Sequence, residues 1–326
     1  MNSLFFPDVP ASCQEVALRK MKKAAVIIIN PVAGGGRGRK LIHLLEPEFE
    51  KMFGEEYELQ ITQGTGHASQ LARQAVEREA SLILAVGGDG TLNEVVNGML
   101  HNGPNSCELG ILNCGSGSGM AQTLQLPTNL SAQLEMACNT TAKPLDVGVL
   151  HYDGQNGKPA KRLFISECQA GISAYVVSRV GMKHKRFGGS IAFASVAIPA
   201  LFRYRALEMT IRLDQSPAES RKLIGISIGN GNHCAGGMQL TPLAFPDDGW
   251  LDVLRIGEMA LWERLVNFPK VYRGSHIHSP HFKIGRAREI EIEAEEPVWV
   301  ETDGELIGKT PCRISMLPGA IQVRRP

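Results

Sequence analysis

The sequence predicts two domains: an α/β domain built on a parallel sheet at residues 1–142, and a strand-rich β-sandwich domain at residues 143–326. The chain is longer than one hydrophobic core usually organises. Strand and helix patterns alternate up to about residue 142, as they do in parallel sheets with crossover helices. Beyond Pro144, short strand patterns follow one another with few helices between them.

In the first domain, a β-branched run at residues 24–29 is typical of a strand that is buried on both faces. Further strand patterns alternate with amphipathic helix patterns after it. The strands are predicted at 57–62, 81–86 and 109–112, and the helices at 40–52, 67–79 and 92–100.

The second domain is predicted to be a β-sandwich because its strands are short and polar turns separate them. Two helical stretches interrupt the strands, one at 172–202 and another from about residue 260. The last strand can pack back on the first domain. The strands are predicted at 146–150, 162–166, 206–213, 223–228, 251–256, 289–293, 298–301 and 321–324.

Composition narrows the class of protein. The formal net charge of +1 gives no global field toward nucleic acid, so we expect no nucleic-acid partner. The seven cysteines are widely spaced without a CxxC pair, which disfavours a disulfide framework or a zinc site and favours a reducing, cytoplasmic compartment. We find no convincing signal peptide and no run long enough to span a bilayer, so a lipid would be reached from the membrane surface.

Three predicted strands of the first domain end in glycine-rich segments, at 30–36 (NPVAGGG), 87–91 (GGDGT) and 115–119 (GSGSG). The carboxyl ends of parallel strands share one edge of the sheet, where ligands bind. Glycines let backbone N–H groups approach phosphate, and the helices that follow add their dipoles. The pattern predicts a polyphosphate site, although for the first segment alone glycine could equally just end a strand.

The carboxylate of Asp89 is informative because a carboxylate beside phosphate is unfavourable without a cation or a transferable proton. Asp89 therefore indicates magnesium or proton handling. The chain contains no GxxxxGK[ST] motif and no complete GxGxxG motif after its first strand, so these two common nucleotide signatures do not apply.

Six segments in order along the chain resemble the diacylglycerol kinase catalytic domain superfamily, which includes bacterial lipid kinases, sphingosine kinases and ceramide kinases. GGDGT is shared with NAD kinases, whereas PDDGWLD and TDGE together point to the lipid branch. The segments are NPVAGGG from Asn30, TQGTGHA from Thr62, VGGDGTLNEVVNG from Val86, LGILNCGSGSGMA from Leu109, GNGNHCAGGMQLTPLAFPDDGWLDV from Gly229, and ETDGE from Glu301.

The resemblance implies an α/β nucleotide-binding domain and a β-sandwich lipid-binding domain with a cleft between them. It implies an enzyme that transfers the γ-phosphate of ATP to a hydroxyl of a membrane lipid, diacylglycerol-like or sphingoid. The residues it places at the nucleotide are Asn30, Pro31, Thr62, Gly87, Gly88, Asp89, Gly90, Thr91, Asn93, Glu94, Gly115 and Ser116.

The resemblance also implies a magnesium ion held by Asp248 and the backbone carbonyls of Phe245 and Trp250. Asp303 and Glu305 would stand at the catalytic centre, one of them as the base. In the sphingosine-kinase branch that role belongs to the residue matching Asp89, so the base remains open among these three carboxylates. Spacing alone would read Asp303-Gly304 as an ordinary hairpin turn.

Two departures from the motifs of the family bear on which lipid is the phosphate acceptor. The third loop reads GSGSG where bacterial members usually read G-T-x-N-D, which is nearer the sphingosine and ceramide kinase pattern. Sphingoid enzymes, however, carry a sequence similar to GxIAD after the domain boundary, and its Asp faces the lipid ammonium. In this chain, Tyr175 stands at the position of that Asp. We therefore expect a neutral, diacylglycerol-like acceptor, with Glu167 as the nearby carboxylate that could substitute.

Two alternatives remain at this stage: an NAD kinase-like phosphotransferase, which shares the GGDG loop, and a non-catalytic nucleotide or lipid sensor, which the altered third loop would suit. The β-rich second domain weighs against the first alternative, and retention of Asp89, Asp303 and Glu305 weighs against the second. A lipid kinase is expected to work at the bilayer surface as a cytoplasmic, peripherally associated protein. A homodimer is compatible with the sequence, which does not fix the oligomeric state.

Overall fold

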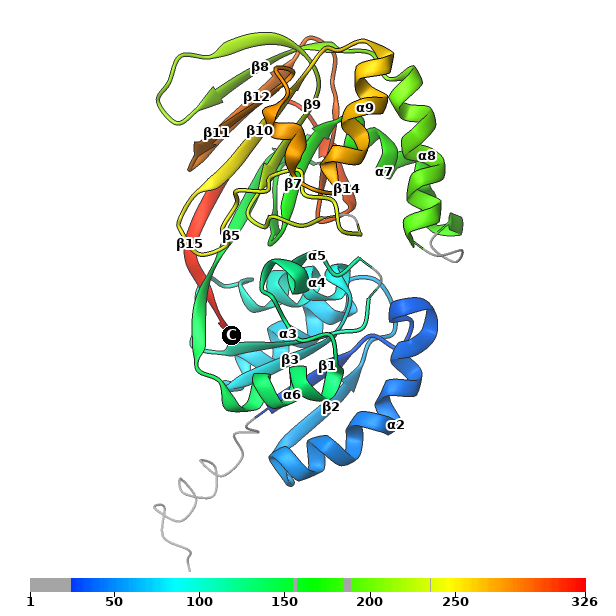
Figure 1. Ribbon diagram of the computed structural model, residues 1–326. Helices are drawn as coiled ribbons and strands as arrows, with labels where there is room; N and C mark the ends of the chain where they lie inside the picture. The colour runs from blue at the N-terminus through cyan, green and yellow to red at the C-terminus, as the bar shows by residue number, and fades with distance from the viewer. Residues whose placement is uncertain (1–24, 116, 155–156, 185–188, 235) are drawn as a thin grey trace, which may run out of the picture.

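The computed structural model describes residues 25–326 except 116, 155–156, 185–188 and 235. It contains an α/β domain and a strand-rich domain, which Figure 1 shows one above the other. The first domain comprises β1 (Ala25–Ile29), α2 (Ala33–Phe53), β2 (Tyr57–Ile61), α3 (His67–Glu77), β3 (Leu82–Gly87), α4 (Asp89–Met99), β4 (Glu108–Asn113), α5 (Gly119–Thr123) and α6 (Leu130–Asn139).

The sheet of the first domain is parallel in the order β2-β1-β3-β4, as predicted. Every residue of β1 is buried because both faces of the sheet are covered. Val26 and Ile28 pack in one apolar cluster with α3 and α4, whereas Ile27 and Ile29 pack in another with α2 and α6. The carboxyl ends of β1, β3 and β4 therefore lie at one edge, next to the loops that follow them.

The second domain wraps its strands around an apolar core, and α7, α8 and α9 lie together at one side of it (Figure 1). Its elements are β5 (Ala142–Asp153), β6 (Pro159–Phe164), β7 (Glu167–Gly171), α7 (Ile172–His184), α8 (Gly189–Arg203), β8 (Leu207–Leu213), β9 (Glu219–Gly229), β10 (Leu251–Gly257), α9 (Leu261–Val271), η2 (Ser275–His278), β11 (Phe282–Ala287), β12 (Glu289–Ala294), β13 (Trp299–Thr302), β14 (Glu305–Lys309) and β15 (Cys312–Arg324).

Two long strands join the domains. β5 leaves the first domain and pairs antiparallel with β15 from Ala142↔Arg324 to Tyr152↔Cys312. The end of β15 also pairs in parallel with β4, so the last strand does pack back on the first sheet. The proposed boundary at residue 142 coincides with the first residue of β5, which then runs into the second domain.

Three strands escaped the sequence analysis: β7, β11 and β14. β7 reads ECQAG, which has none of the β-branched character that predicts strands, yet all five residues are buried between neighbouring strands and a helix. The predicted helical stretch 172–202 forms two helices, α7 and α8. No helix among the described residues is both long enough and apolar enough to cross a membrane.

Candidate active site

The N-terminus of α4 is the centre of the candidate nucleotide site. Gly88 is extended at the N-cap position, and no side chain caps the helix there. The first N–H groups of a helix have no partner inside the helix, and they favour an anion together with the helix dipole. This end of α4 can therefore receive a phosphate group.

Close contact between two loops explains two of the glycines. A Cβ atom on Gly115 would lie 2.5 Å from the Cα atom of Gly88, and one on Gly88 would lie 3.1 Å from that of Gly115. The loops after β3 and β4 can touch only because neither residue has a side chain. A Cβ atom on Gly90, by contrast, would meet nothing within 4 Å. The open side of this pair of loops is therefore at Gly90, where a ligand has room.

The loop after β1 joins the same edge. The Asn30 side-chain amide donates to Thr91 Oγ1 at 2.9 Å, and the Val32 N–H donates to Asn30 Oδ1 at 3.1 Å. Thr62 is buried, and its N–H donates to the carbonyl of Ile29 at 2.9 Å. The structure thus brings Asn30, Pro31 and Thr91 together with the glycine loops, and Ser116 lies outside the described residues.

Glu94 and Asn93 of α4 bind protein groups. Glu94 accepts the N–H groups of Gly66 and Ala68 at 2.8 and 3.1 Å, so it fixes the start of α3. Asn93 is buried and donates to the carbonyl of Leu163 and to Asp303 Oδ2, at 2.9 and 2.7 Å. Both residues therefore position the loops of the site through protein contacts, and a direct nucleotide contact by either stays a prediction.

Asp89 occupies the first position of α4 and faces the third loop. Its carboxylate accepts the N–H groups of Gly119 and Met120 at 3.1 and 3.3 Å. Burial raises the pKa of the Asp89 carboxyl above its usual value, and these two N–H groups oppose the rise. A carboxylate with a raised pKa is better matched to accepting a proton near neutral pH.

Asp303 links the two domains. It sits in a two-residue turn between β13 and β14, where Asp303 and Gly304 have φ angles of 47° and 79°, the left-handed region that Asp and Gly tolerate in tight hairpins. Its carboxylate accepts the N–H groups of Ile165, Ser166 and Glu167 at 2.9, 2.9 and 3.0 Å. The Asn93 amide is a fourth donor at 2.7 Å.

These four donors decide what Asp303 can do. The four donors occupy the roughly four lone-pair positions of the carboxylate, so little capacity remains to accept a proton from a substrate. Burial raises the pKa of the Asp303 carboxyl, while the hydrogen bonds act against that rise. The arrangement is that of a positioning residue that holds β6, β7 and α4 in place.

Glu305 begins β14 and pairs with Arg162 of β6. Arg162 Nη2 lies 2.7 Å from Glu305 Oε2 and 2.7 Å from Asn93 Oδ1. The Glu305 side chain is one-third exposed, at 33%. Among the three predicted catalytic carboxylates, Glu305 and Asp303 thus belong to one interdomain network with Asn93, whereas Asp89 lies beside the glycine loops.

The predicted magnesium ligands lie in one turn, where the Asp248 carboxylate already binds protein groups. Asp248 Oδ2 forms an ion pair with Arg286, and Oδ1 accepts the N–H of Trp250 at 3.0 Å. The Trp250 ring packs against the Arg288 guanidinium at 4.5 Å. A cation at Asp248 would have to displace Arg286, and no cluster of three or more acidic, His or Cys ligands occurs within the described part of the chain. A magnesium ion at this turn therefore stays a prediction, and it would compete with Arg286 for Asp248.

A buried polar patch lies on the opposite side of the domain boundary from Asp89. The sequence singled out Glu167 as a candidate carboxylate, but it did not predict that Glu167 shares a polar face with other side chains. The patch consists of Glu167, Gln169, Ser227 and Glu301. Gln169 is paired with both Ser227 and Glu301 on neighbouring strands, so these side chains share one face of the sheet. Their neighbours along the strands, including Cys168 and Ile228, pack into the sandwich core, so the patch faces α7.

The patch has unused hydrogen-bonding capacity. Gln169 Oε1 and Ser227 Oγ are buried without a partner among the described residues. Burial raises the pKa of the Glu167 carboxyl to about 8, and the charges of Asp303 and Asp89 add to the rise. Burial likewise raises the pKa of Glu301. The period-two alternation of Glu167-Cys168-Gln169-Ala170 was the sequence signal that could have revealed a strand with one polar face.

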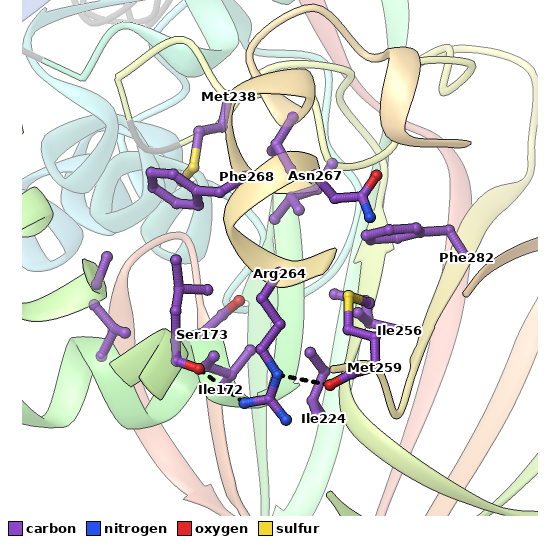
Figure 2. A pocket seen from close by; sticks show the side chains of 15 residues that line it. Ile172, Ser173, Ile224, Met238, Ile256, Met259, Arg264, Asn267, Phe268 and Phe282 are labelled. Carbon is purple, nitrogen blue, oxygen red and sulfur yellow. Dashed lines mark hydrogen bonds between the residues drawn. The ribbon is translucent and has the colours of Figure 1, made fainter. Parts of the chain in front are cut away.

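An apolar pocket lies near this patch and shares helix α7 with it (Figure 2). Its walls come from α7, α8, α9, β9 and β10, and the side chains that Figure 2 shows around it include Ile172, Met238 and Phe268. Met238 exchanges backbone hydrogen bonds with Cys234, whose thiol bonds to Glu167. Cys234 therefore links the pocket wall at Met238 to the patch at Glu167.

Arg264 is the charged residue on the pocket wall, and its role is structural. Its guanidinium donates to the carbonyl of Met259 at 3.2 Å (Figure 2). It also donates to the carbonyls of Leu201 and Tyr204 at 2.9 and 2.7 Å, which fastens α9 to the end of α8. With that charge engaged by carbonyl oxygens, the remaining lining suits a hydrocarbon chain.

Comparisons with known proteins agree with this architecture. Residues 24–150 match the diacylglycerol kinase catalytic domain, and residues 166–325 match the YegS C-terminal NAD kinase beta sandwich-like domain. A diacylglycerol kinase of Staphylococcus epidermidis is 28% identical over 306 residues, which are 94% of this chain and 93% of the relative. One of Staphylococcus haemolyticus is 28% identical over 94% of this chain and 89% of its own.

A solved diacylglycerol kinase from Bacillus anthracis str. Sterne has the same fold, with a TM-score of 0.69 at 21% identity over 93% of this chain and 97% of its own. Both domains of the predicted fold are thus matched, and in the predicted order. The chain belongs to the diacylglycerol kinase catalytic domain superfamily, a family of lipid kinases.

Proposed function

We propose that this protein transfers the γ-phosphate of ATP to the free hydroxyl of a neutral, diacylglycerol-like lipid. One observation carries the proposal. The uncapped, glycine-walled N-terminus of α4 begins with Asp89, whose carboxylate accepts the N–H of Gly119. Gly119 in turn lies against Cys234, whose thiol bonds to Glu167 of the polar patch. A phosphate donor and a lipid acceptor could therefore meet at Asp89.

In the proposed reaction, the acceptor hydroxyl oxygen forms a bond to the γ-phosphorus, and the bond between that phosphorus and the β–γ bridging oxygen breaks. ADP leaves with the bonding electrons. The hydroxyl proton passes to the Asp89 carboxylate, because Asp303 is saturated by four donors and Glu305 is paired with Arg162. Magnesium enters with ATP, as phosphoryl transfer requires.

The acceptor is proposed to be neutral because, among the described residues, neither position considered for binding an ammonium group, Tyr175 or Glu167, offers an ionised carboxylate. Tyr175 packs against Tyr204 at 5.4 Å, and the Arg179 guanidinium lies 5.2 Å from the Tyr175 ring. Glu167, with its pKa raised to about 8, is protonated at neutral pH and presents a hydroxyl donor to an ester or hydroxyl. A sphingoid ammonium would have to lose its hydration without a matching charge, which is costly.

The test is a radiolabel transfer assay with γ-labelled ATP and three separate acceptors: dispersed dioleoylglycerol, sphingosine and NAD. We expect label in the diacylglycerol product only. Transfer to NAD alone would replace the proposal with the NAD kinase alternative, and transfer to none would support the non-catalytic alternative. A strong preference for sphingosine, lost in Glu167→Gln, would show that Glu167 supplies the missing charge.

The proton acceptor is tested with Asp89→Asn. Loss of a general base lowers turnover by about 10²- to 10⁴-fold, while affinity for a fluorescent ATP analogue should change little. Near-normal turnover in Asp89→Asn would contradict the assignment of Asp89.

A further inference from the structure

Helices α8 and α9 are apolar on their outer faces as well as their inner ones. Their inner faces bury Ala197 and Ala200 of α8, and Asn267 and Val271 of α9. Six large side chains point the other way, with 43% to 66% of each exposed: Ile198, Phe202, Leu261, Trp262, Leu265 and Val266. We call these six residues the α8–α9 surface.

Helix geometry places these side chains together. Leu261, Trp262, Leu265 and Val266 follow the i, i+1, i+4, i+5 pattern of one helix face, and Ile198 and Phe202 are one turn apart on α8. The two helices contact each other, as Figure 1 shows. Single exposed apolar residues are ordinary, but a contiguous patch of this kind marks an interaction surface.

A basic pocket adjoins the start of α9. It is lined by Arg221, Lys222, Arg255 and Lys283, together with His281. His281 also contacts α9 directly, because its Nε2 lies 2.9 Å from Glu263 Oε1, one residue along the chain from Trp262. Glu219 pairs with Arg221 and Arg255 and offsets one of these charges, so the pocket stays positive.

The α8–α9 surface therefore combines an exposed indole and aliphatic side chains with cationic groups at its edge. Amphipathic elements that lie in the interface of a bilayer have this composition, with Trp and Leu in the acyl boundary and Lys and Arg near anionic head groups. A protein partner would also cover apolar residues, but only a bilayer matches the pocket beneath, because the inner faces of α8 and α9 line it.

We propose that the α8–α9 surface and the adjoining basic pocket dock the protein on an anionic bilayer, so that lipid enters the apolar pocket between these helices. The choice of a bilayer as the occupant rests on the proposed function. Docking would bring the pocket wall formed by Leu201 and Phe268 to the depth of the lipid acyl chains.

The experiment measures sedimentation of the full-length protein with vesicles of phosphatidylcholine, alone or with about one third phosphatidylglycerol. The double variant Trp262→Ser/Leu265→Ser should bind both kinds of vesicle at least tenfold more weakly, since each large side chain contributes that much when fully buried in the acyl boundary. Lys222→Gln/Lys283→Gln should lose affinity only for the anionic vesicles. Leu44→Ser, an equally exposed apolar residue on α2, is the matched control and should bind as wild type.

Two readouts separate this inference from the proposed function. Turnover on a short-chain diacylglycerol dissolved below its aggregation limit should be unchanged in the double variant, whereas turnover on vesicle-embedded diacylglycerol should fall with binding. Vesicle binding through this surface by a protein that phosphorylates no lipid would overturn the proposed function alone. Wild-type vesicle affinity in the double variant would overturn the docking surface alone. Light scattering that shows a dimer dissociated by the same substitutions, with vesicle binding retained, would also overturn it by assigning the surface to a second copy.

Discussion

Replacing Asp303 by asparagine tests whether this residue positions the site or accepts a proton. The carboxylate receives four hydrogen bonds, three from the backbone N–H groups of Ile165, Ser166 and Glu167 and one from Asn93. An asparagine side chain offers one oxygen with two lone pairs, and its NH₂ group faces donors. Two buried N–H groups lose their acceptor in Asp303→Asn.

Each buried donor left without a partner costs about 1–3 kcal/mol, so the free energy of unfolding should fall by roughly 2–6 kcal/mol. One kcal/mol shifts the melting temperature of a protein of about 150–250 residues by about 2–4 °C, which predicts a fall of at least about 4 °C. Turnover should fall with it because Asn93 and the β6–β7 backbone lose their anchor. ATP affinity should stay near wild type, since no glycine loop is altered.

Asp214→Asn is the matched control. Asp214 also has a positive φ of 49° and accepts two backbone N–H groups, from Arg288 and Glu289 at 2.9 Å each, but its turn is exposed to solvent. Its loss should cost no more than about 1 kcal/mol. Melting is followed by circular dichroism and turnover by label transfer. If Asp303→Asn melted like the wild type and lost only turnover, the positioning role would be wrong and Asp303 would be the base.

Three further perturbations follow from the site. Gly88→Val should keep the far-ultraviolet spectrum of a folded protein but weaken binding of a fluorescent ATP analogue by more than about tenfold, because the side chain fills the contact with the third loop and blocks phosphate. Gly90→Ala, whose methyl group meets no protein atom within 4 Å, should keep full stability. Unchanged ATP affinity in both variants would argue against the phosphate site at these glycines. A chelator of divalent cations should shift the melting temperature of the nucleotide-free protein by less than about 2 °C, because Arg286 already neutralises Asp248; a large fall would reveal a structural metal. Burial raises the pKa of Glu167 to about 8 from 4.5, so the folded chain keeps a proton that the unfolded chain releases, and stability should fall as the pH rises between these values, by at most about 1.4 kcal/mol per pH unit. Urea unfolding at about pH 5 and about pH 8 should show a smaller fall in Glu167→Gln, and equal falls would mean that Glu167 titrates normally.

The first domain was predictable because its signals are local. Buried β-branched runs, amphipathic helices and glycine-rich strand ends each lie within a few residues, and the structure confirms all four strands and three helices they predicted. The need for glycine at residues 88 and 115 also follows from the structure, which shows their backbones in contact. What the sequence could not supply was the geometry of that contact, since it joins loops from different strands.

The second domain was harder because its key features depend on distant pairings. β7 is a strand through its neighbours β9 and β13, which lie about 60 and 130 residues further along the chain. The same holds for the polar patch, whose members become neighbours only through strand register. The pairing of Asp248 with Arg286 likewise required the β10–β11 hairpin to be in place.

Helix α4 is the element through which the two substrates would be coupled. Its first turn presents the phosphate site at Gly88 and Asp89, and its second turn carries Asn93, which holds both Asp303 and Arg162 of the second domain. An α-helix rises only about 1.5 Å per residue, so these groups are fixed within about one turn of each other. A rotation of one domain against the other would break the contacts of Asn93 with Asp303 and Arg162. We therefore expect the Asn93 network to set the distance between nucleotide and acceptor, so that Asp303 and Glu305 would affect turnover without touching the transferred proton.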